Sequence, residues 1–326
     1  MTRSAVPPPV TAVMDAASAW LPERMAEVED RLAEVAIGHG MALGGEAEAT
    51  LSAGGKRLRP LLVLIAAGNT AAAKAVRAAV AIELIHMATL VHDDVLDGAP
   101  VRRGRPTVVA RAGRERALGV GDLLLSRAFA ELAEKDGEGE VAELSSASVA
   151  LALGELTQRA DAYDTTIGEE RYMWRCSLKT ARLFEAACRA GRLASGAPGT
   201  EELAAFGRQI GLAFQLLDDV LDVSGPPERT GKARGTDLLD GTVTLPLILA
   251  RVRDPEIEAA ELRGIAPAAA EALCDRIAAS GALEEVRERA RAGIGRAKRL
   301  LEAEAFSAEE RQLLSLIADG VVERYS

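Results

Sequence analysis

Apolar residues recur at helical spacing along almost the whole of this 326-residue chain, and this periodicity constrains its fold more than any other feature. Long segments with the 3.6-residue period of an amphipathic helix follow one another, separated by short Gly or Pro signals, and no segment shows a convincing strand alternation. Aromatic residues make up only 3% of the chain although 48% of it is hydrophobic, so the core must consist of Ala, Leu, Val and Ile. Ala and Leu are strong helix formers. The sequence therefore predicts an all-α protein.

The periodicity places most of the chain in helices and leaves two notable segments outside them. Residues 1–10 are Pro-rich and are expected to be disordered, and residues 224–242 are too rich in Gly and Pro for a continuous helix. A loop that long in a compact domain is usually functional. The expected helices cover residues 11–37, 46–53, 58–68, 71–97, 114–135, 138–162, 168–195, 200–223, 244–252, 267–280, 282–304 and 307–324.

Charge and cysteine content exclude several classes of protein. The chain has 39 Lys+Arg against 49 Asp+Glu, a net charge of −10, which argues against a nucleic-acid partner. Its three cysteines lack metal-ligand spacing and are typical of reduced thiols in an intracellular protein. The first ten residues contain no apolar run of a signal peptide, and no stretch approaches the ~18 apolar residues of a membrane span. We therefore expect a cytoplasmic protein with no transmembrane segment.

The pentapeptide Asp-Asp-Val-Leu-Asp occurs twice, beginning at Asp93 and at Asp218, and each copy closes a long apolar helix. Within each copy the first and last carboxylates lie at i, i+4 and project from one face of the helix. Such a pair costs an isolated helix about 0.2–0.5 kcal/mol, and carboxylates near a helix C-terminus also oppose the macrodipole. A chain that makes this unfavourable choice twice is expected to hold cations there. All-oxygen ligands favour a hard cation such as Mg²⁺ and disfavour zinc.

Basic residues form separate clusters in this acidic chain. Each cluster alone is more often a solvated surface feature, but Mg²⁺ sites combined with several Arg and Lys residues are what diphosphate binding requires. Two such ligands would explain the number of clusters. His86, two turns before Asp93, is either a satisfied helix-face histidine or a donor to a diphosphate oxygen. The basic clusters contain Lys56, Arg57 and Arg59; Arg102, Arg103 and Arg105; Lys179, with Thr180 beside it; and Lys232.

Over essentially its whole length the chain resembles the trans-isoprenyl diphosphate synthases (polyprenyl synthetases), and most of all their long-chain subgroup. The resemblance implies one all-α domain over residues 11–326, with helices around a deep apolar cavity, usually in a homodimer. Several ordered motifs make the match specific, whereas one DDxxD motif alone would not. The matching segments are GGKRLRP, ELIHMATLVHDDVLDGAPVRRGRPT, GDLLLSRAF, GELTQRADAYDTTIGEERYMWRCSLKTARLFEAA, FQLLDDVLD and GKARGTDLLDGTVTLP.

The resemblance also implies roles for matching positions. Asp93, Asp97 and Asp218 should coordinate Mg²⁺, three ions once diphosphate is bound, and the ions with Arg102 and Lys179 should stabilise the leaving diphosphate. Asp94, Asp219 and Asp222 belong to the same motifs and should act through water or through other ligands. The allylic diphosphate should contact Arg102, Lys179, Thr180, Gln215 and Lys232. Isopentenyl diphosphate should contact Lys56, Arg59, His86 and Arg103. Thr242 stands where the family commonly has a lysine and has no assigned role.

The residues before Asp93 indicate the length of the product. In the family a bulky aromatic four or five residues before this aspartate blocks the tunnel, whereas this chain has Thr89 and Ala88 there and Ile85 one turn deeper. This pattern is typical of long-chain enzymes, with products of roughly thirty carbons or more and transient membrane contact. A twenty-carbon geranylgeranyl product stays open, because Ala88 could be a tight packing position while residues 151–160 supply the floor.

Two other classes of function are remoter. A class I terpene cyclase also uses an aspartate-rich helix and Mg²⁺, but it normally carries a different second metal motif and needs no GGKRLRP segment. A non-catalytic partner subunit of a heteromeric synthase would usually lack some of the aspartates, and both clusters are intact here.

Overall fold

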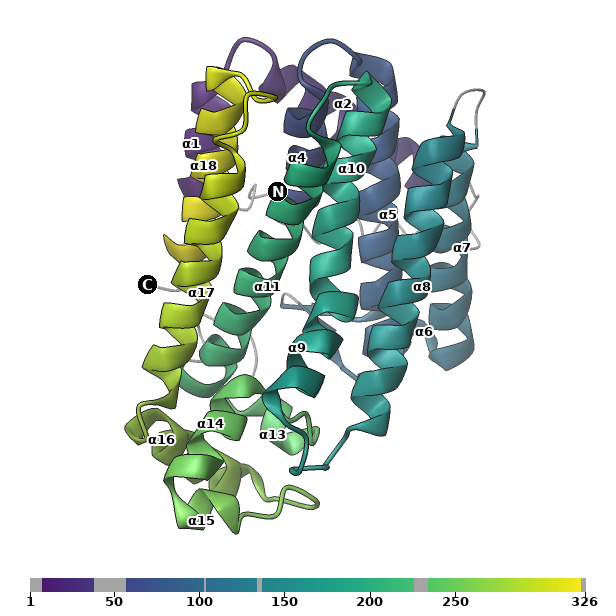
Figure 1. Ribbon diagram of the computed structural model, residues 1–326. Helices are drawn as coiled ribbons and strands as arrows, with labels where there is room; N and C mark the ends of the chain where they lie inside the picture. The colour runs from purple at the N-terminus through teal and green to yellow at the C-terminus, as the bar shows by residue number, and fades with distance from the viewer. Residues whose placement is uncertain (1–7, 38–56, 103, 134–136, 226–233, 324–326) are drawn as a thin grey trace.

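The computed structural model describes residues 8–37, 57–102, 104–133, 137–225 and 234–323 (Figure 1). Nearly all regular structure in these ranges is helical, so the all-α prediction is confirmed. The expected helix at 46–53 lies outside the described residues. The helices are α1 (Pro8–Ala16), α2 (Leu21–Ile37), α4 (Leu58–Ala67), α5 (Ala72–Asp97), α6 (Val108–Ala112), α7 (Arg114–Leu132), α8 (Glu138–Ala160), α9 (Glu169–Cys176), η1 (Ser177–Ala181), α10 (Arg182–Ser195), α11 (Thr200–Ser224), α13 (Thr236–Leu239), α14 (Leu245–Arg253), α15 (Pro255–Glu258), α16 (Pro267–Ala279), α17 (Ala282–Leu300) and α18 (Ala308–Glu323).

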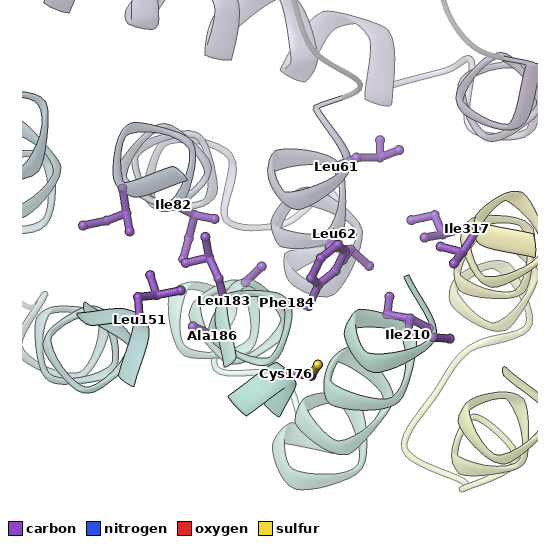
Figure 2. Close-up of a cluster of buried hydrophobic side chains, with 14 of the residues drawn as sticks. Leu61, Leu62, Ile82, Leu151, Cys176, Leu183, Phe184, Ala186, Ile210 and Ile317 are labelled. Atoms are coloured by element: carbon purple, nitrogen blue, oxygen red, sulfur yellow. The ribbon is translucent and has the colours of Figure 1, made fainter. Parts of the chain in front are cut away.

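The long helices form an elongated bundle around α10 (Figure 1). Helix α10 packs against α4, α5, α8 and α11, while α17 covers α11 and α7 covers α5. In Figure 2, Ile82 of α5 and Leu151 of α8 lie on one side of α10, and Leu62 of α4 and Ile210 of α11 lie on the other. All four side chains are buried. Because α5 is apolar around nearly its whole circumference, it occupies the interior as a core helix.

Glycines let the backbones of the central helices approach one another. A Cβ atom at Gly191 of α10 would lie 2.4 Å from the carbonyl oxygen of Val63 on α4. A Cβ atom at Gly207 of α11 would lie 2.6 Å from the carbonyl oxygen of Phe184 on α10. Real side chains do not tolerate such distances. The bundle therefore compensates for its few aromatic residues by close helix packing, which holds α4 and α11 against α10.

The N-terminal part of the chain differs from the expectation. Helix α1 begins at Pro8, inside the segment expected to be disordered, and the expected helix 11–37 is broken between Ala16 and Leu21. Pro22 explains where the second helix begins, since a residue without a backbone N–H is tolerated in the first turn and not in a helix interior.

Several short elements were not predicted. Strands β1 (Val101–Arg102) and β2 (Arg105–Pro106) form a small antiparallel hairpin, so the expectation of no strand is wrong there. Two residues per strand are too few to show alternation. The helices α6, α13 and α15 were missed for the same reason, because four or five residues carry no detectable helical period.

Among the described residues one helix, α5, is long and apolar enough to cross a membrane by length and composition alone. Most of its apolar stretch is buried inside the bundle, as expected of a core helix. The expectation that no stretch reaches this length is therefore wrong for α5, which mixes its apolar residues with Thr, His and few charges.

We expect Gly191→Ala to lower the free energy of unfolding by about 1–3 kcal/mol, because the added methyl group overpacks the contact between α10 and α4. Chemical denaturation monitored by circular dichroism measures this change. Gly119→Ala is the matched control, since Gly119 lies in α7 with nothing within 4 Å of its Cβ position. There alanine is expected to stabilise the protein by about 0.5–1 kcal/mol. Equal effects at both positions would contradict the close packing.

Candidate active site

The two aspartate clusters end two helices that run in the same direction through the bundle, α5 and α11 (Figure 1). Between α8 and α11 lies η1, a single π-helical turn that joins α9 to α10. Such turns are rare inside helices and occur frequently at functional sites, because the extra residue redirects neighbouring side chains. This turn carries Lys179 and Thr180.

Lys179 faces the first cluster. Its ammonium pairs with the carboxylate of Glu155 on α8, and Asp93 is close enough to interact with it electrostatically. Burial would lower the pKa of Lys179, but the charges of Asp93 and Glu155 hold it above its ordinary value. Gly154 permits this contact, since a Cβ atom there would lie 2.7 Å from the backbone nitrogen of Lys179.

Thr180 faces the second cluster. Its hydroxyl donates to Oε1 of Gln215 at 2.5 Å, and Nε2 of Gln215 donates to Oδ1 of Asp219 at 2.7 Å. Lys179 and Thr180 are consecutive residues of one turn. Lys179 interacts with the cluster that begins at Asp93, and Thr180 is linked through Gln215 to the cluster that begins at Asp218. This turn therefore links residues near both aspartate clusters.

The first cluster is surrounded by cations in this structure. Nε of Arg102, on β1, donates to Oδ1 of Asp94 at 2.7 Å, and Arg159 of α8 pairs with Asp97. Burial raises the pKa of Asp93 to about 6, and the charges of Glu155 and Asp97 act in the same direction. The result is an acidic site whose carboxylates are held in place by neighbouring positive charges.

The second cluster combines exposed and buried carboxylates. Asp218 is exposed on α11, whereas Asp219 is buried, and Asp222 accepts a hydrogen bond from the backbone nitrogen of Asp237 at 3.2 Å. Asp237 lies on α13, inside the stretch expected to be a long functional loop. Burial raises the pKa of Asp219, as does the negative charge of Asp237.

The donor set fits a hard cation. Within the described part of the chain, no three His, Cys, Asp or Glu side chains converge closely enough to hold a metal ion alone. A metal bound to either aspartate motif therefore needs further ligands from water or from phosphate oxygens. This is how Mg²⁺ usually binds, through one or two carboxylates plus substrate phosphates.

The remaining predicted site residues have different positions. The Arg59 guanidinium lies over the ring of Phe184, 4.3 Å from its centre, and His86 is half-buried on α5. Ala88 and Ile85 are buried, while the Thr89 hydroxyl donates to the carbonyl oxygen of His86 at 2.8 Å. Lys56, Arg103 and Lys232 lie outside the described residues.

Four residues of the site were not singled out from the sequence. Glu155 and Arg159 lie four residues apart, so they share one face of α8, and this spacing could have indicated an ion pair. Asp237 stands in the Gly-rich stretch after the second cluster. Tyr172 donates from its hydroxyl to Oδ2 of Asp219 at 2.5 Å, and a lone tyrosine in a helix gives no sequence signal.

Comparison with known proteins is consistent with this geometry. The family model for polyprenyl synthetases matches residues 42–276. The chain is 41% identical over 245 residues to heptaprenyl diphosphate synthase component 2 from Geobacillus stearothermophilus, covering 74% of this chain and 76% of that protein. It is 38% identical over 275 residues to the geranyl-diphosphate-specific all-trans-nonaprenyl-diphosphate synthase from Rhodobacter capsulatus, covering 82% and 84%.

Solved structures show the same fold over nearly all of the chain. The polyprenyl synthase from Caulobacter crescentus, crystallised with calcium and isoprenyl diphosphate, has a TM-score of 0.89 and 34% identity, with 100% of both chains covered. Heptaprenyl diphosphate synthase from Staphylococcus aureus has a TM-score of 0.88 and 29% identity, covering 94% of this chain and 99% of that one.

We expect Asp93→Asn to raise the free energy of unfolding of the metal-free protein at pH 7.5 by about 1–2 kcal/mol. The folded-state pKa of Asp93 is about 6 instead of the ordinary 3.8, so the folded chain binds the proton more tightly than the unfolded chain. The Asp93 contribution to stability therefore falls as the pH rises from about 4 through 6. The gain from asparagine should shrink at pH 5, and thermal unfolding at both pH values measures it.

Asp164→Asn is the matched control, because the pKa of Asp164 is shifted in the direction opposite to that of Asp93. Hydrogen bonds from Thr166 lower the pKa of Asp164, so its stabilising contribution is present at pH 7.5 and is lost in acid. Asparagine there should not stabilise the protein at pH 7.5. A gain at Asp93 that is absent, or that is equal at both pH values, would contradict the burial of that carboxylate.

Proposed function

Because this chain belongs to the polyprenyl synthetase family, we propose that it is a prenyltransferase that condenses isopentenyl diphosphate head-to-tail with an allylic prenyl diphosphate. The observation that carries this proposal is the π-helical turn, whose Lys179 and Thr180 connect the two aspartate clusters. A diphosphate between the clusters would meet metal-binding carboxylates on both sides and cationic side chains beside them.

The allylic diphosphate is assigned to this space. Asp93 and Asp97 on α5 and Asp218 on α11 would hold Mg²⁺, three ions in all, which supply charge neutralisation for the departing diphosphate. Arg102 and Lys179 contribute preorganised positive charge at the same place. The carboxylates of Asp94, Asp219 and Asp222 would act on the metal ions indirectly, through water or through the other ligands. The buried positions of Asp94 and Asp219 agree with this role. Thr180 and Gln215 lie beside it, and Lys232 completes the predicted contacts.

Isopentenyl diphosphate is assigned to Arg59 and His86, together with Lys56 and Arg103. The carbon–oxygen bond to the allylic diphosphate breaks, the double bond of isopentenyl diphosphate attacks the resulting allylic cation, and the new cation then loses a proton. No side chain singled out here is an obvious base, so the released diphosphate is the assigned acceptor. The apolar bundle interior beneath the site excludes water, which would otherwise convert the cation to an alcohol.

A long product is the favoured outcome. Ala88 and Ile85 are buried on the α5 face below Asp93 and neither is aromatic, so no bulky ring occupies those positions. Relatives with the names heptaprenyl, octaprenyl and nonaprenyl synthase are consistent with this assignment. The long lipid would leave the enzyme through transient contact with a membrane.

A product-length assay tests the function. Purified protein receives Mg²⁺, isopentenyl diphosphate and, in separate reactions, dimethylallyl, geranyl, farnesyl or geranylgeranyl diphosphate, and products are resolved by mass. We expect wild-type products of roughly thirty carbons or more. Ala88→Phe is expected to shorten them, because the ring fills the space below Asp93.

The alternatives have distinct outcomes in the same assay. A wild-type product that stops at twenty carbons would support geranylgeranyl diphosphate synthesis. It would also mean that a helix other than α5 closes the end of the product tunnel. Unchanged product length in Ala88→Phe would remove Ala88 from the chain-length assignment. No elongation from any starter would overturn the synthase proposal and support a cyclase or a non-catalytic subunit.

We further propose that the protein forms a homodimer through α8. Val149, Leu153 and Leu156 are 58%, 48% and 67% exposed, and their i, i+4, i+7 spacing places them on one face of the helix. A contiguous exposed apolar stripe is typical of a protein interface. The relative named component 2 makes a second, different subunit the alternative occupant of this face.

Leu153→Glu is expected to convert the dimer to a monomer, because a charge in an apolar interface must lose its hydration. Light scattering coupled to size exclusion measures the mass. Val252→Glu is the matched control, since Val252 is 87% exposed on α14, away from α8, and should leave the mass unchanged. A wild-type protein that is monomeric alone and captures a different synthase-like chain would favour the heteromeric alternative.

A further inference from the structure

The buried carboxylate of Asp219 is the centre of a hydrogen-bond network that joins α9, η1 and α11. Its Oδ1 accepts from Gln215, which in turn accepts from Thr180, and its Oδ2 accepts from the hydroxyl of Tyr172 at 2.5 Å. Each carboxylate oxygen thus has a donor within the protein. Asp219 is 3% exposed, so it has little access to solvent.

Tyr172, which also contacts the buried Cys176 thiol, has no role in the diphosphate chemistry assigned above. It lies on α9 and is 1% exposed, so its hydroxyl is fully enclosed. A hydrogen bond to a buried carboxylate is stronger than one between neutral groups, and leaving such a carboxylate oxygen without a donor carries a large desolvation penalty. The hydroxyl, and not only the ring, therefore contributes to the orientation of Asp219, together with Gln215.

We propose that Tyr172 is a positioning residue for the second metal site. By holding Asp219 in one rotamer, it fixes this carboxyl group next to Asp218 and keeps the Gln215–Thr180 link directed toward the allylic diphosphate. This inference rests on the proposed function, since it assigns Tyr172 a role in Mg²⁺-dependent diphosphate binding. Tyr172 contacts no substrate and acts through Asp219.

A purely structural tyrosine would behave differently. If Tyr172 served only to fill the core, removal of its hydroxyl would lower the thermal stability of the metal-free protein and leave ligand binding by the folded protein unchanged. A positioning role instead changes the Mg²⁺ dependence of binding. The two roles are separated by measuring binding directly, without turnover.

The test is isothermal titration calorimetry of inorganic pyrophosphate at a series of Mg²⁺ concentrations, with the full-length protein. Tyr172→Phe removes one oxygen atom and keeps the ring, and it is expected to weaken Mg²⁺-dependent pyrophosphate binding about tenfold, the loss typical of one hydrogen bond to a charged group. Tyr163→Phe is the matched control. The guanidinium carbon of Arg263 lies 4.5 Å from the centre of the Tyr163 ring. Phenylalanine keeps this contact, so pyrophosphate binding should stay within twofold of the wild type.

A double-mutant cycle shows whether Tyr172 acts through Asp219. Asp219→Asn keeps the shape of the side chain and removes its charge, and in that background Tyr172→Phe should have little further effect. Equal effects of Tyr172→Phe in both backgrounds would overturn the proposal. Wild-type-like pyrophosphate binding by Tyr172→Phe, with or without a lower Tm, would also overturn it.

The same titration separates this inference from the proposed function. A wild-type protein that shows no Mg²⁺-dependent pyrophosphate binding would contradict the diphosphate site itself. If Tyr172→Phe gives no folded protein, 3-fluorotyrosine incorporated into a Tyr163→Phe, Tyr325→Phe chain labels Tyr172 alone. Its fluorine resonance should then shift when Mg²⁺ and pyrophosphate are added together, and an unchanged resonance would overturn the proposal.

Discussion

Repulsion among carboxylates is the constraint on which the rest of this site depends. Asp93, Asp94 and Asp97 lie close together at the end of α5, and burial makes the charge of Asp93 harder to hold there. Positive charges from three different elements offset this repulsion. They are Arg102 on β1, Arg159 on α8 and Lys179 on η1. Each of these three elements must therefore be placed accurately. The helical bundle brings all three to one end of α5.

Glycines at helix contacts allow these elements to be placed accurately. Gly154 allows α8 to touch the backbone at Lys179, and Gly191 and Gly207 allow α10 to touch both α4 and α11. Close packing of this kind leaves neighbouring helices few alternative arrangements, since a shift of either helix brings backbone atoms into collision. A chain with few aromatic residues thus obtains a rigid interior from close backbone contacts instead of large side chains.

Sequence analysis predicted the long helices well, because α7, α10 and α11 each contain several turns of regular apolar spacing and α5 is a long apolar stretch rich in Ala and Leu. The aspartate motifs were also visible, since i, i+4 carboxylates on a helix have a definite physical cost. The π-helical turn was not, because one extra residue in a turn leaves no compositional trace. Tyr172 and the Glu155–Arg159 pair depend on contacts between elements distant in sequence, which periodicity cannot reveal. The domain boundaries and the cytoplasmic location stay predictions.

The ion pairs of the first cluster have a consequence for how ligands enter. Lys179 pairs with Glu155, and Arg159 pairs with Asp97, in the space assigned to the diphosphate. Binding of a diphosphate there, as proposed, would therefore be an exchange of ionic partners, in which internal pairs open as new ones form. Dissolved salt weakens both the pairs that are lost and the pairs that are gained. Affinity for the proposed diphosphate would then depend less on ionic strength than the number of basic residues at the site suggests.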